Sequence, residues 1–243
     1  MSDYAASVTK AKSRPPLEDD RTTLLVHELQ APLTVLRVRL EKALQASWCG
    51  PECRAALEPC LENLRGASQM VSDLLLLEEA GASELTPHRE AIDLQELASE
   101  ASRDYLALAE SEGIRLTLDE LPSVKVMGNA RELQRILVNL LDNAIRHTAS
   151  GGAIRVRIAL AGGYAELRVI DNGPGISPEH QPRIFERFYQ IDRDADRAAG
   201  GVGLGLAIAR SLAERNGAHV DLESAPGKGS TFILRLPIAT AND

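Results

Sequence analysis

The stretch over residues 129–148 has the sequence NARELQRILVNLLDNAIRHT and predicts an amphipathic helix with a polar stripe. Its apolar residues recur at three- and four-residue spacing: they are Leu133, Ile136, Leu137, Leu140 and Ala144. On the other side, Asn139, Asn143 and Arg146 are spaced by four and three residues and share one face. Asparagine is a poor residue inside a helix, and its carboxamide oxygen is a suitable ligand for Mg²⁺. Two interpretations remain open, a solvated pair of amides or a ligand site.

Two glycine-containing segments downstream favour the ligand site. The first, residues 171–176 (DNGPGI), directly follows a predicted strand, and Asp171 can accept a hydrogen bond from an exocyclic amine. Gly173 and Gly175 let the backbone turn sharply and approach a flat ring closely. The second segment, residues 200–206 (GGVGLGL), leads into a predicted helix whose first N–H groups would attract an anion such as phosphate. Because it follows a loop and not a strand, it does not match a dinucleotide-binding turn.

The chain around these segments has a mixed α/β pattern. Asp93 and Asn129, each followed three residues later by Glu, predict capping boxes for helices that end near residues 110 and 147. Short apolar runs predict strands over residues 114–118, 124–127, 153–160, 164–170, 219–223 and 231–236. The stretch over 171–202 is rich in Gly, Pro, Arg and Asp and is expected to be a long loop, a functional lid or a disordered segment.

The N-terminal third of the chain has a purely helical pattern. Residues 1–16 lack periodicity and are expected to be a mobile lead-in, followed by one helix from 17 to about 47 and a second from about 51 to 81. Apolar positions in the second helix alternate steps of four and three, which is typical of the seam of a bundle. Two helices cannot cover their own apolar stripes, so we expect two copies to form a four-helix bundle. The alternative is a hairpin that folds back on the downstream domain.

One histidine on the first of these helices stands out, in the sequence VHELQAPLT over residues 26–34. Leu25 and Leu29 belong to the apolar side of the helix, and at about 100° per residue His27 points nearly opposite to them. His27 is therefore expected to face water beside the carboxylate of Glu28. This arrangement suits a phosphate acceptor, although an ordinary surface histidine has the same pattern.

Composition narrows the function classes. With 27 Lys+Arg against 35 Asp+Glu, the net charge of −8 disfavours general nucleic-acid binding, while a single bound nucleotide remains compatible. The apolar run Leu74-Leu75-Leu76-Leu77 is far shorter than the roughly 18 residues that span a bilayer, and no signal peptide is apparent. The cysteines Cys49, Cys53 and Cys60 are expected to be reduced thiols, and a metal or redox site there is disfavoured because no second ligand pair accompanies them.

Taken in order, these segments resemble the sensor histidine kinases of two-component signalling. The matching boxes are the histidine box 27–34, the N box 139–148, the glycine boxes 171–176 and 201–206, and the phenylalanine box 184–189. Each box is weak alone, but five in this order are highly specific. The resemblance implies a helical hairpin that forms a dimeric four-helix bundle, the dimerisation and histidine phosphotransfer domain, over 17–83. It implies for 84–243 a catalytic α/β sandwich of the Bergerat ATP-binding type, a mixed sheet with helices on one face, as in gyrase and mismatch-repair ATPases.

The resemblance also implies roles for individual residues. Asn143 would bind Mg²⁺, Asn139 would contact the ligand near the phosphates, and Arg146 would bind phosphate. His147 stands where the family often has tyrosine, and Asp171 would fix the adenine amine. The remaining ATP-site residues implied by the boxes and the last turn are Gly173, Gly175, Ile176, Tyr189, Gly201, Gly203, Leu204, Gly205 and Thr231.

The implied reaction is phosphoryl transfer, with ATP and Mg²⁺ as cofactors. His27 would attack the γ-phosphorus in line, and Glu28 would accept a hydrogen bond from the other imidazole nitrogen. An aspartate on the receiver domain of a response regulator would then take the phosphoryl group. We expect a cytoplasmic homodimer, either a soluble kinase or the cytoplasmic portion of a membrane-bound sensor.

One departure from the family's pattern, one open role and two rival functions remain. Ala31 stands where many family members carry Thr or Asn to orient a hydrolytic water, so phosphatase activity is expected to be weak. The lid arginines could contact phosphate or simply pair with the aspartates of the same segment; they are Arg183, Arg187, Arg193 and Arg197, beside Asp192, Asp194 and Asp196. The rivals are an ATPase clamp of the same superfamily and a dimeric scaffold that binds nucleotide without transfer. The clamp is disfavoured because those relatives carry Glu at the position of Asn139, and an amide is no general base.

Overall fold

The computed structural model describes residues 19–46, 49–82, 89–119, 122–191 and 202–239, and it divides the chain into two compact units. The units are Met1–Leu64 and Arg65–Asp243, so the division falls inside the second helix. The side chains of residues 19–28, 31, 62, 65 and 78–82 are not described. The expected lead-in over 1–16 and the expected boundary between residues 83 and 84 lie outside the described residues.

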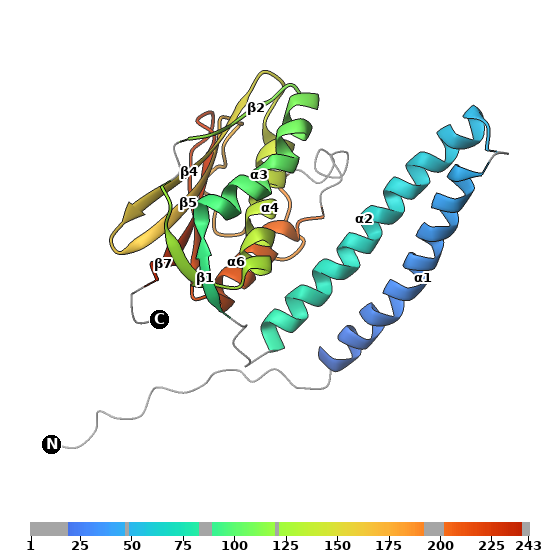
Figure 1. Cartoon of the computed structure of the whole chain (residues 1–243), viewed down its shortest axis with the longest axis horizontal. Coiled ribbons are helices and arrows are strands. Elements are labelled where there is room, and N and C mark those ends of the chain that lie inside the picture. The colour runs from blue at the N-terminus through green and yellow to red at the C-terminus, as the bar shows by residue number, and fades with distance from the viewer. Residues whose placement is uncertain (1–18, 47–48, 83–88, 120–121, 192–201, 240–243) are drawn as a thin grey trace, which may run out of the picture. The chain divides into compact units, whose positions relative to one another are not determined.

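Two long helices dominate the N-terminal part. Helix α1 (Asp19–Gln45) continues through Pro32, and helix α2 (Pro51–Ala82) starts after a short reversal of the chain (Figure 1). Cys49 donates its backbone N–H to the carbonyl of Ala46 at 3.0 Å, which closes the turn. Both helices were predicted within two residues of their observed ends. None of the described helices combines the length and apolar character needed to cross a membrane.

The second unit is built on a five-stranded mixed sheet in the order β2-β4-β5-β7-β6. Its strands are β2 (Arg115–Leu118), β4 (Ala153–Ala161), β5 (Tyr164–Asp171), β6 (His219–Ser224) and β7 (Ser230–Pro237). Only the β2–β4 pair is parallel, and the other neighbours are antiparallel. On β4 the buried residues Ile154, Val156 and Ile158 alternate with polar ones, as expected when one face of a sheet is covered. The expected mixed sheet is confirmed.

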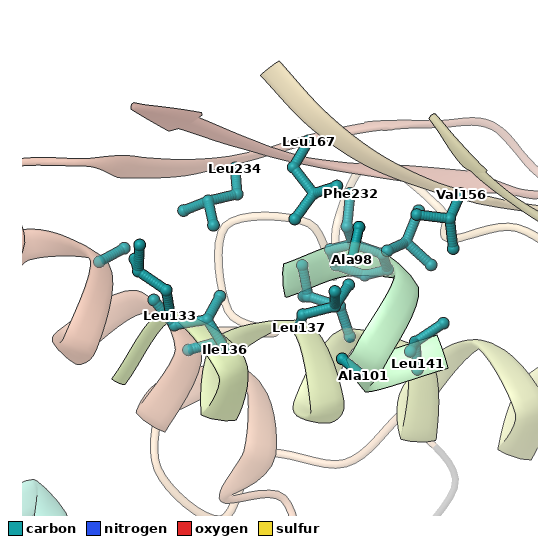
Figure 2. Close-up of a cluster of buried hydrophobic side chains, with 14 of the residues drawn as sticks. Ala98, Ala101, Leu133, Ile136, Leu137, Leu141, Val156, Leu167, Phe232 and Leu234 are labelled. Atoms are coloured by element: carbon teal, nitrogen blue, oxygen red, sulfur yellow. The ribbon is translucent and has the colours of Figure 1, made fainter. Parts of the chain in front are cut away.

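Three helices cover that face: α3 (Leu94–Ser111), α4 (Ala130–His147) and α6 (Gly205–Arg215) (Figure 1). Leu133, Ile136 and Leu137 of α4 are fully buried and face Leu167 and Leu234 of the sheet (Figure 2). The apolar stripe predicted for residues 129–148 is therefore the side of α4 that builds the core. Leu141, which was not in the predicted stripe, is also fully buried, and α3 covers that side of the helix.

A small second sheet was not predicted in full. Strand β1 (Glu90–Asp93) pairs antiparallel with β3 (Lys125–Gly128), and only β3 was expected from the sequence. Of the four residues in β1 only Ile92 is buried, so the strand carries almost no apolar pattern. It forms because β3 offers it a partner, which is a tertiary and not a local cause.

The capping box at Asn129 is partly corrected by the structure. The Asn129 side chain accepts a hydrogen bond from the N–H of Glu132 at 3.1 Å, as predicted. The Glu132 carboxylate does not reach back: it accepts from Nδ2 of Asn216 at 2.7 Å, and the Asn129 N–H donates to Oδ1 of Asn216 at 2.8 Å. Asn216, only 1% exposed at the end of α6, therefore completes the cap of α4 from a distant part of the chain.

Replacing Asn216 by alanine is expected to lower the unfolding free energy by about 1–3 kcal/mol, because the half-buried N–H of Asn129 loses its acceptor and Glu132 loses one hydrogen bond while keeping its ion pair with Arg215 at 3.2 Å. Urea denaturation followed by circular dichroism measures this change. The control is Arg210→Ala, which removes an exposed ion pair with Glu214 at 3.1 Å and should cost less than about 0.5 kcal/mol. Equal losses for the two variants would show that Asn216 is not a structural link.

Candidate functional site

The polar stripe of α4 lies along a cavity in the second unit. Asn139, Asn143, Arg146 and His147 all line it, together with residues 202–206 that lead into α6. Asn139 is 6% exposed, and its Nδ2 is buried with no hydrogen-bond acceptor among the described residues. A buried donor without an acceptor is costly, and a ligand oxygen would satisfy it. Asn139 is therefore not part of a solvated surface, whereas Arg146 and His147 at the end of the stripe are exposed.

The predicted glycine segment packs directly against this stripe. A Cβ on Gly205 would lie 3.8 Å from Cγ of Asn139, so the start of α6 approaches the amide closely. Gly203 has φ +74°, and a Cβ there would lie 2.6 Å from the carbonyl oxygen of Tyr189. Only glycine fits that position without strain. The first N–H groups of α6 thus start beside Asn139, where the positive end of the helix dipole favours an anion.

Asp171, at the end of β5, forms the other side of the site. Its carboxylate is 7% exposed, and Oδ1 accepts from the N–H of Gly173 at 2.9 Å and from the N–H of Ser230 at 3.1 Å. The described residues offer Oδ2 no hydrogen bond. Burial raises the pKa of the Asp171 carboxyl, and the two backbone hydrogen bonds oppose that shift. One carboxylate oxygen is therefore fixed by the fold, and the second is able to accept further hydrogen bonds.

Asp171 opens onto a cavity of about 310 Å³, within the range of small-molecule sites. Asn143 and His147 line this cavity as well as the one beside Asn139, so the two adjoin. The other lining residues include Pro174, Gly175, Ile176, Ile184, Tyr189, Leu206 and Ser230. Gly175 has φ +72°, and a Cβ there would lie 2.0 Å from the carbonyl oxygen of Ala225, so this wall also requires glycine. The result is an apolar pocket that contains one buried carboxylate and lies next to a polar pocket.

Tyr189 is held at the edge of both cavities by side chains that sequence reasoning missed or left open. Its hydroxyl is hydrogen-bonded to Nδ1 of His180 at 2.7 Å, and the guanidinium of Arg183 lies 4.3 Å from its ring centre. Arg183 also pairs with Glu186 at 3.3 Å, so its two partners lie within the phenylalanine box. Phe188 has a left-handed backbone (φ +62°), and its N–H donates to the carbonyl of Gly203 at 2.8 Å. These contacts tie residues 180–189 to the glycine segment.

Several predicted residues stand apart from these cavities or cannot be placed. Thr231 pairs with Ile170 and Glu223 inside the sheet, while its neighbour Ser230 lines the cavity; the alternation of a strand could have indicated this residue. Gly173 forms the turn after Asp171. Gly201 and the lid residues 192–200 lie outside the described residues. His27 and Glu28 belong to α1, and their side chains are not described.

Comparisons with known proteins agree with this geometry. Residues 128–240 match the family described as histidine kinase-, DNA gyrase B-, and HSP90-like ATPase. The chain is 36% identical over 219 residues to the sensor histidine kinase RppB of Synechocystis, a match that covers 89% of this chain and 48% of RppB. It is 34% identical over 226 residues to the phosphate regulon sensor protein PhoR of Pseudomonas aeruginosa, covering 93% of this chain and 51% of PhoR.

Among solved structures, the crystal structure of full-length ShkA in complex with AMPPNP matches with a TM-score of 0.78 and 26% identity, over 92% of this chain and 46% of ShkA. The chain spans about half the length of the curated relatives it matches. The order of the sequence boxes, the α/β sandwich fold and the matches to known proteins all point to the same family. The chain belongs to the sensor histidine kinase family.

Proposed function

We propose that this chain is the kinase core of a two-component sensor, which binds ATP, phosphorylates its own His27 and passes the phosphoryl group to an aspartate of a response regulator. The observation that carries the proposal is the pairing of two adjoining cavities. One contains the Asp171 carboxylate with a free oxygen, and the other contains the amides of Asn139 and Asn143 at the start of α6. A purine with an exocyclic amine suits the first, and a polyphosphate suits the second.

The residues of the second cavity fit a nucleotide bound with Mg²⁺. The unpartnered Nδ2 of Asn139 is a donor for a phosphate oxygen, and the carboxamide oxygen of Asn143 is the hard ligand that Mg²⁺ accepts. The ion would neutralise phosphate charge when bound. Arg146 and the first N–H groups of α6 add positive potential. Support for nucleotide binding also comes from the relative ShkA, whose structure contains AMPPNP.

His27 is the proposed acceptor on α1. A neutral imidazole can attack phosphorus only through a nitrogen that keeps its lone pair, and a carboxylate beside it holds the proton on the other nitrogen. Glu28 supplies that carboxylate in the sequence. Transfer is favoured over hydrolysis because Asn139 is an amide and cannot act as a general base for water. A response regulator would then remove the phosphoryl group from His27.

Dimerisation is part of the proposal, because α1 exposes apolar side chains. Leu29, Val35, Leu36 and Val38 are 51%, 51%, 49% and 40% exposed in the single chain. Leu29 and Leu36 are seven residues apart and share one face of α1, and an exposed apolar face usually marks an interaction surface. We therefore infer a homodimer in which the hairpins of two copies form a four-helix bundle. The proposed division remains a phosphotransfer domain over 17–83 and a catalytic domain over 84–243.

The direct experiment incubates the purified chain with γ-labelled ATP and Mg²⁺. The wild type should take up label that is acid-labile and alkali-stable, and His27→Ala should lose it completely, because no other imidazole replaces the acceptor. His219→Ala, which changes an exposed histidine on β6, serves as the control and should keep full labelling. Label that survives His27→Ala, or that is stable to acid, would contradict the assignment.

Asp171→Asn is expected to weaken ATP binding about 10- to 100-fold, the scale of a lost hydrogen bond to a charged group. The amide oxygen can still accept from Gly173 and Ser230, so the fold should be retained. Fluorescence titration with a labelled ATP analogue measures the affinity. Asp221→Asn, which removes an ion pair with Arg235 at 2.7 Å on the sheet, is the control and should bind normally. An affinity for the ATP analogue that is unchanged by Asp171→Asn would contradict the proposed role of Asp171 in binding adenine.

The same variant has a defined pH dependence of stability. Because the pKa of Asp171 is raised in the folded state, its contribution to stability is full below the pKa of the unfolded chain and is lost as pH rises through the folded pKa. The nucleotide-free Asn variant should therefore gain in unfolding free energy, relative to wild type, as the pH is raised from about 4 to 7. Denaturation curves measured across that range give the difference in unfolding free energy between the Asn variant and the wild type. A difference that falls as the pH rises would show that the ionised carboxylate stabilises the fold.

Ala31→Thr is expected to speed dephosphorylation of a receiver domain by about tenfold or more, since about 1.4 kcal/mol from one positioned water gives that factor. The substrate is any receiver domain that the labelled wild-type chain phosphorylates in vitro, and loss of label from it is followed over time. Ala31→Val, which adds bulk without a hydroxyl, is the matched control and should give no gain. A threonine variant as slow as the valine variant would refute the role of position 31.

A further inference from the structure

Two of the three cysteines lie in contact at the turn between α1 and α2. Cys49 lies two residues before the start of α2 and is 6% exposed, while Cys53 lies in the first turn of α2 and is half-buried. Sγ of Cys49 donates a hydrogen bond to Sγ of Cys53, with the two sulfurs 3.0 Å apart. Both residues lie in the same unit, Met1–Leu64, and both thiols are free. The contact is therefore internal to one part of the chain.

The third cysteine provides a contrast inside the same helix. Cys60 is exposed, and its Sγ donates to the carbonyl of Ala56 at 3.4 Å, one turn earlier in α2. It has an ordinary local partner and no second sulfur. Cys49 and Cys53, by comparison, would need to approach by only about 1 Å to reach the S–S bond length of roughly 2.05 Å. Once one of the two thiols carries a mixed disulfide, this proximity makes the attack of the other thiol intramolecular and fast.

We propose that Cys49 and Cys53 form a redox-active dithiol, which closes reversibly to an intramolecular disulfide by exchange with a small disulfide such as oxidised glutathione. The sequence disfavoured a redox role because the spacing C-x₃-C has no second ligand pair. It could not show that the two sulfurs lie in contact. The proposed site is independent of nucleotide binding and of His27.

The exchange proceeds in two balanced steps. Cys53, the more accessible thiol, loses its proton to solvent and attacks one sulfur of glutathione disulfide, which releases one glutathione thiolate and leaves a mixed disulfide on Cys53. Cys49 then loses its proton to solvent and attacks Sγ of Cys53, which releases the second glutathione. The two protein thiols are oxidised, one glutathione disulfide is reduced, and the two released thiolates take up the two protons.

The buried position of Cys49 explains the order of these steps. The hydrogen bond that Cys49 donates to Cys53 and the burial of its sulfur raise the pKa of the Cys49 thiol. It therefore stays protonated and shielded until the mixed disulfide forms on its neighbour. The product would join the turn covalently to the first turn of α2.

The test uses the full 243-residue chain with oxidised glutathione, and it reads intact mass and the number of thiols that N-ethylmaleimide can alkylate after denaturation. Because the exposed Cys60 takes up a glutathione of its own, the wild type should lose all three alkylatable thiols, with one glutathione adduct and the loss of two hydrogens in mass, and dithiothreitol should restore all three. On a non-reducing denaturing gel the product should run as a single chain.

Variants in a Cys60→Ser background assign the roles. Cys60→Ser alone should close the disulfide as the wild type does. Adding Cys49→Ser should stop the reaction at one glutathione adduct on Cys53, whereas adding Cys53→Ser should slow adduct formation because only the buried thiol is left. Circular dichroism shows that each variant is folded. Three thiols that stay alkylatable, adducts that are never resolved in the Cys60→Ser chain, or a disulfide between two chains would each overturn the proposal.

Discussion

The packing of α4 against the five-stranded sheet fixes the geometry of the site. Leu133, Ile136, Leu137 and Leu140 are fully buried, and each contributes about 1.5–3 kcal/mol of burial free energy. Turning the helix by one residue, about 100°, would expose this set and bury charged side chains in its place. Because the apolar side of α4 is fixed against the sheet, the polar stripe with Asn139 and Asn143 is directed toward the cavity. The ligand stripe is positioned by core packing and not by its own contacts.

Core packing also holds two buried polar groups whose hydrogen-bonding capacity the described residues do not fill. Asn139 has a buried Nδ2 with no acceptor among the described residues, and Asp171 has a carboxylate whose burial raises its pKa. Each is unfavourable in the empty site. In the proposed function, a phosphate oxygen would accept a hydrogen bond from Asn139 and the adenine amine would donate one to Asp171, and both contacts would contribute to the binding free energy. Such local costs are tolerated because the surrounding core over-determines the positions.

Much of the fold follows from local patterns that survive in the tertiary structure. The helices α3 and α4 and six of the strands have strong periodicity and clear start signals, and the structure contains them close to the expected bounds. The exceptions share one cause. Strand β1 has a single buried residue and depends on β3 for pairing, while the cap of α4 is completed by Asn216, which is 87 residues from Asn129. Neither the pairing of β1 with β3 nor the role of Asn216 in the cap of α4 can be recognised from the residues near it in the sequence.

The sequence by itself determined which side chains would share a face. Periodicity placed Asn139 and Asn143 on one stripe of a helix, and residue chemistry marked Asp171 and the glycines as ligand groups. Only the tertiary structure decided that Asp171, Ser230, Tyr189 and the start of α6 meet that stripe. The physical reason is that helix and strand periods act over a few residues, whereas these contacts depend on where packing brings distant segments of the chain.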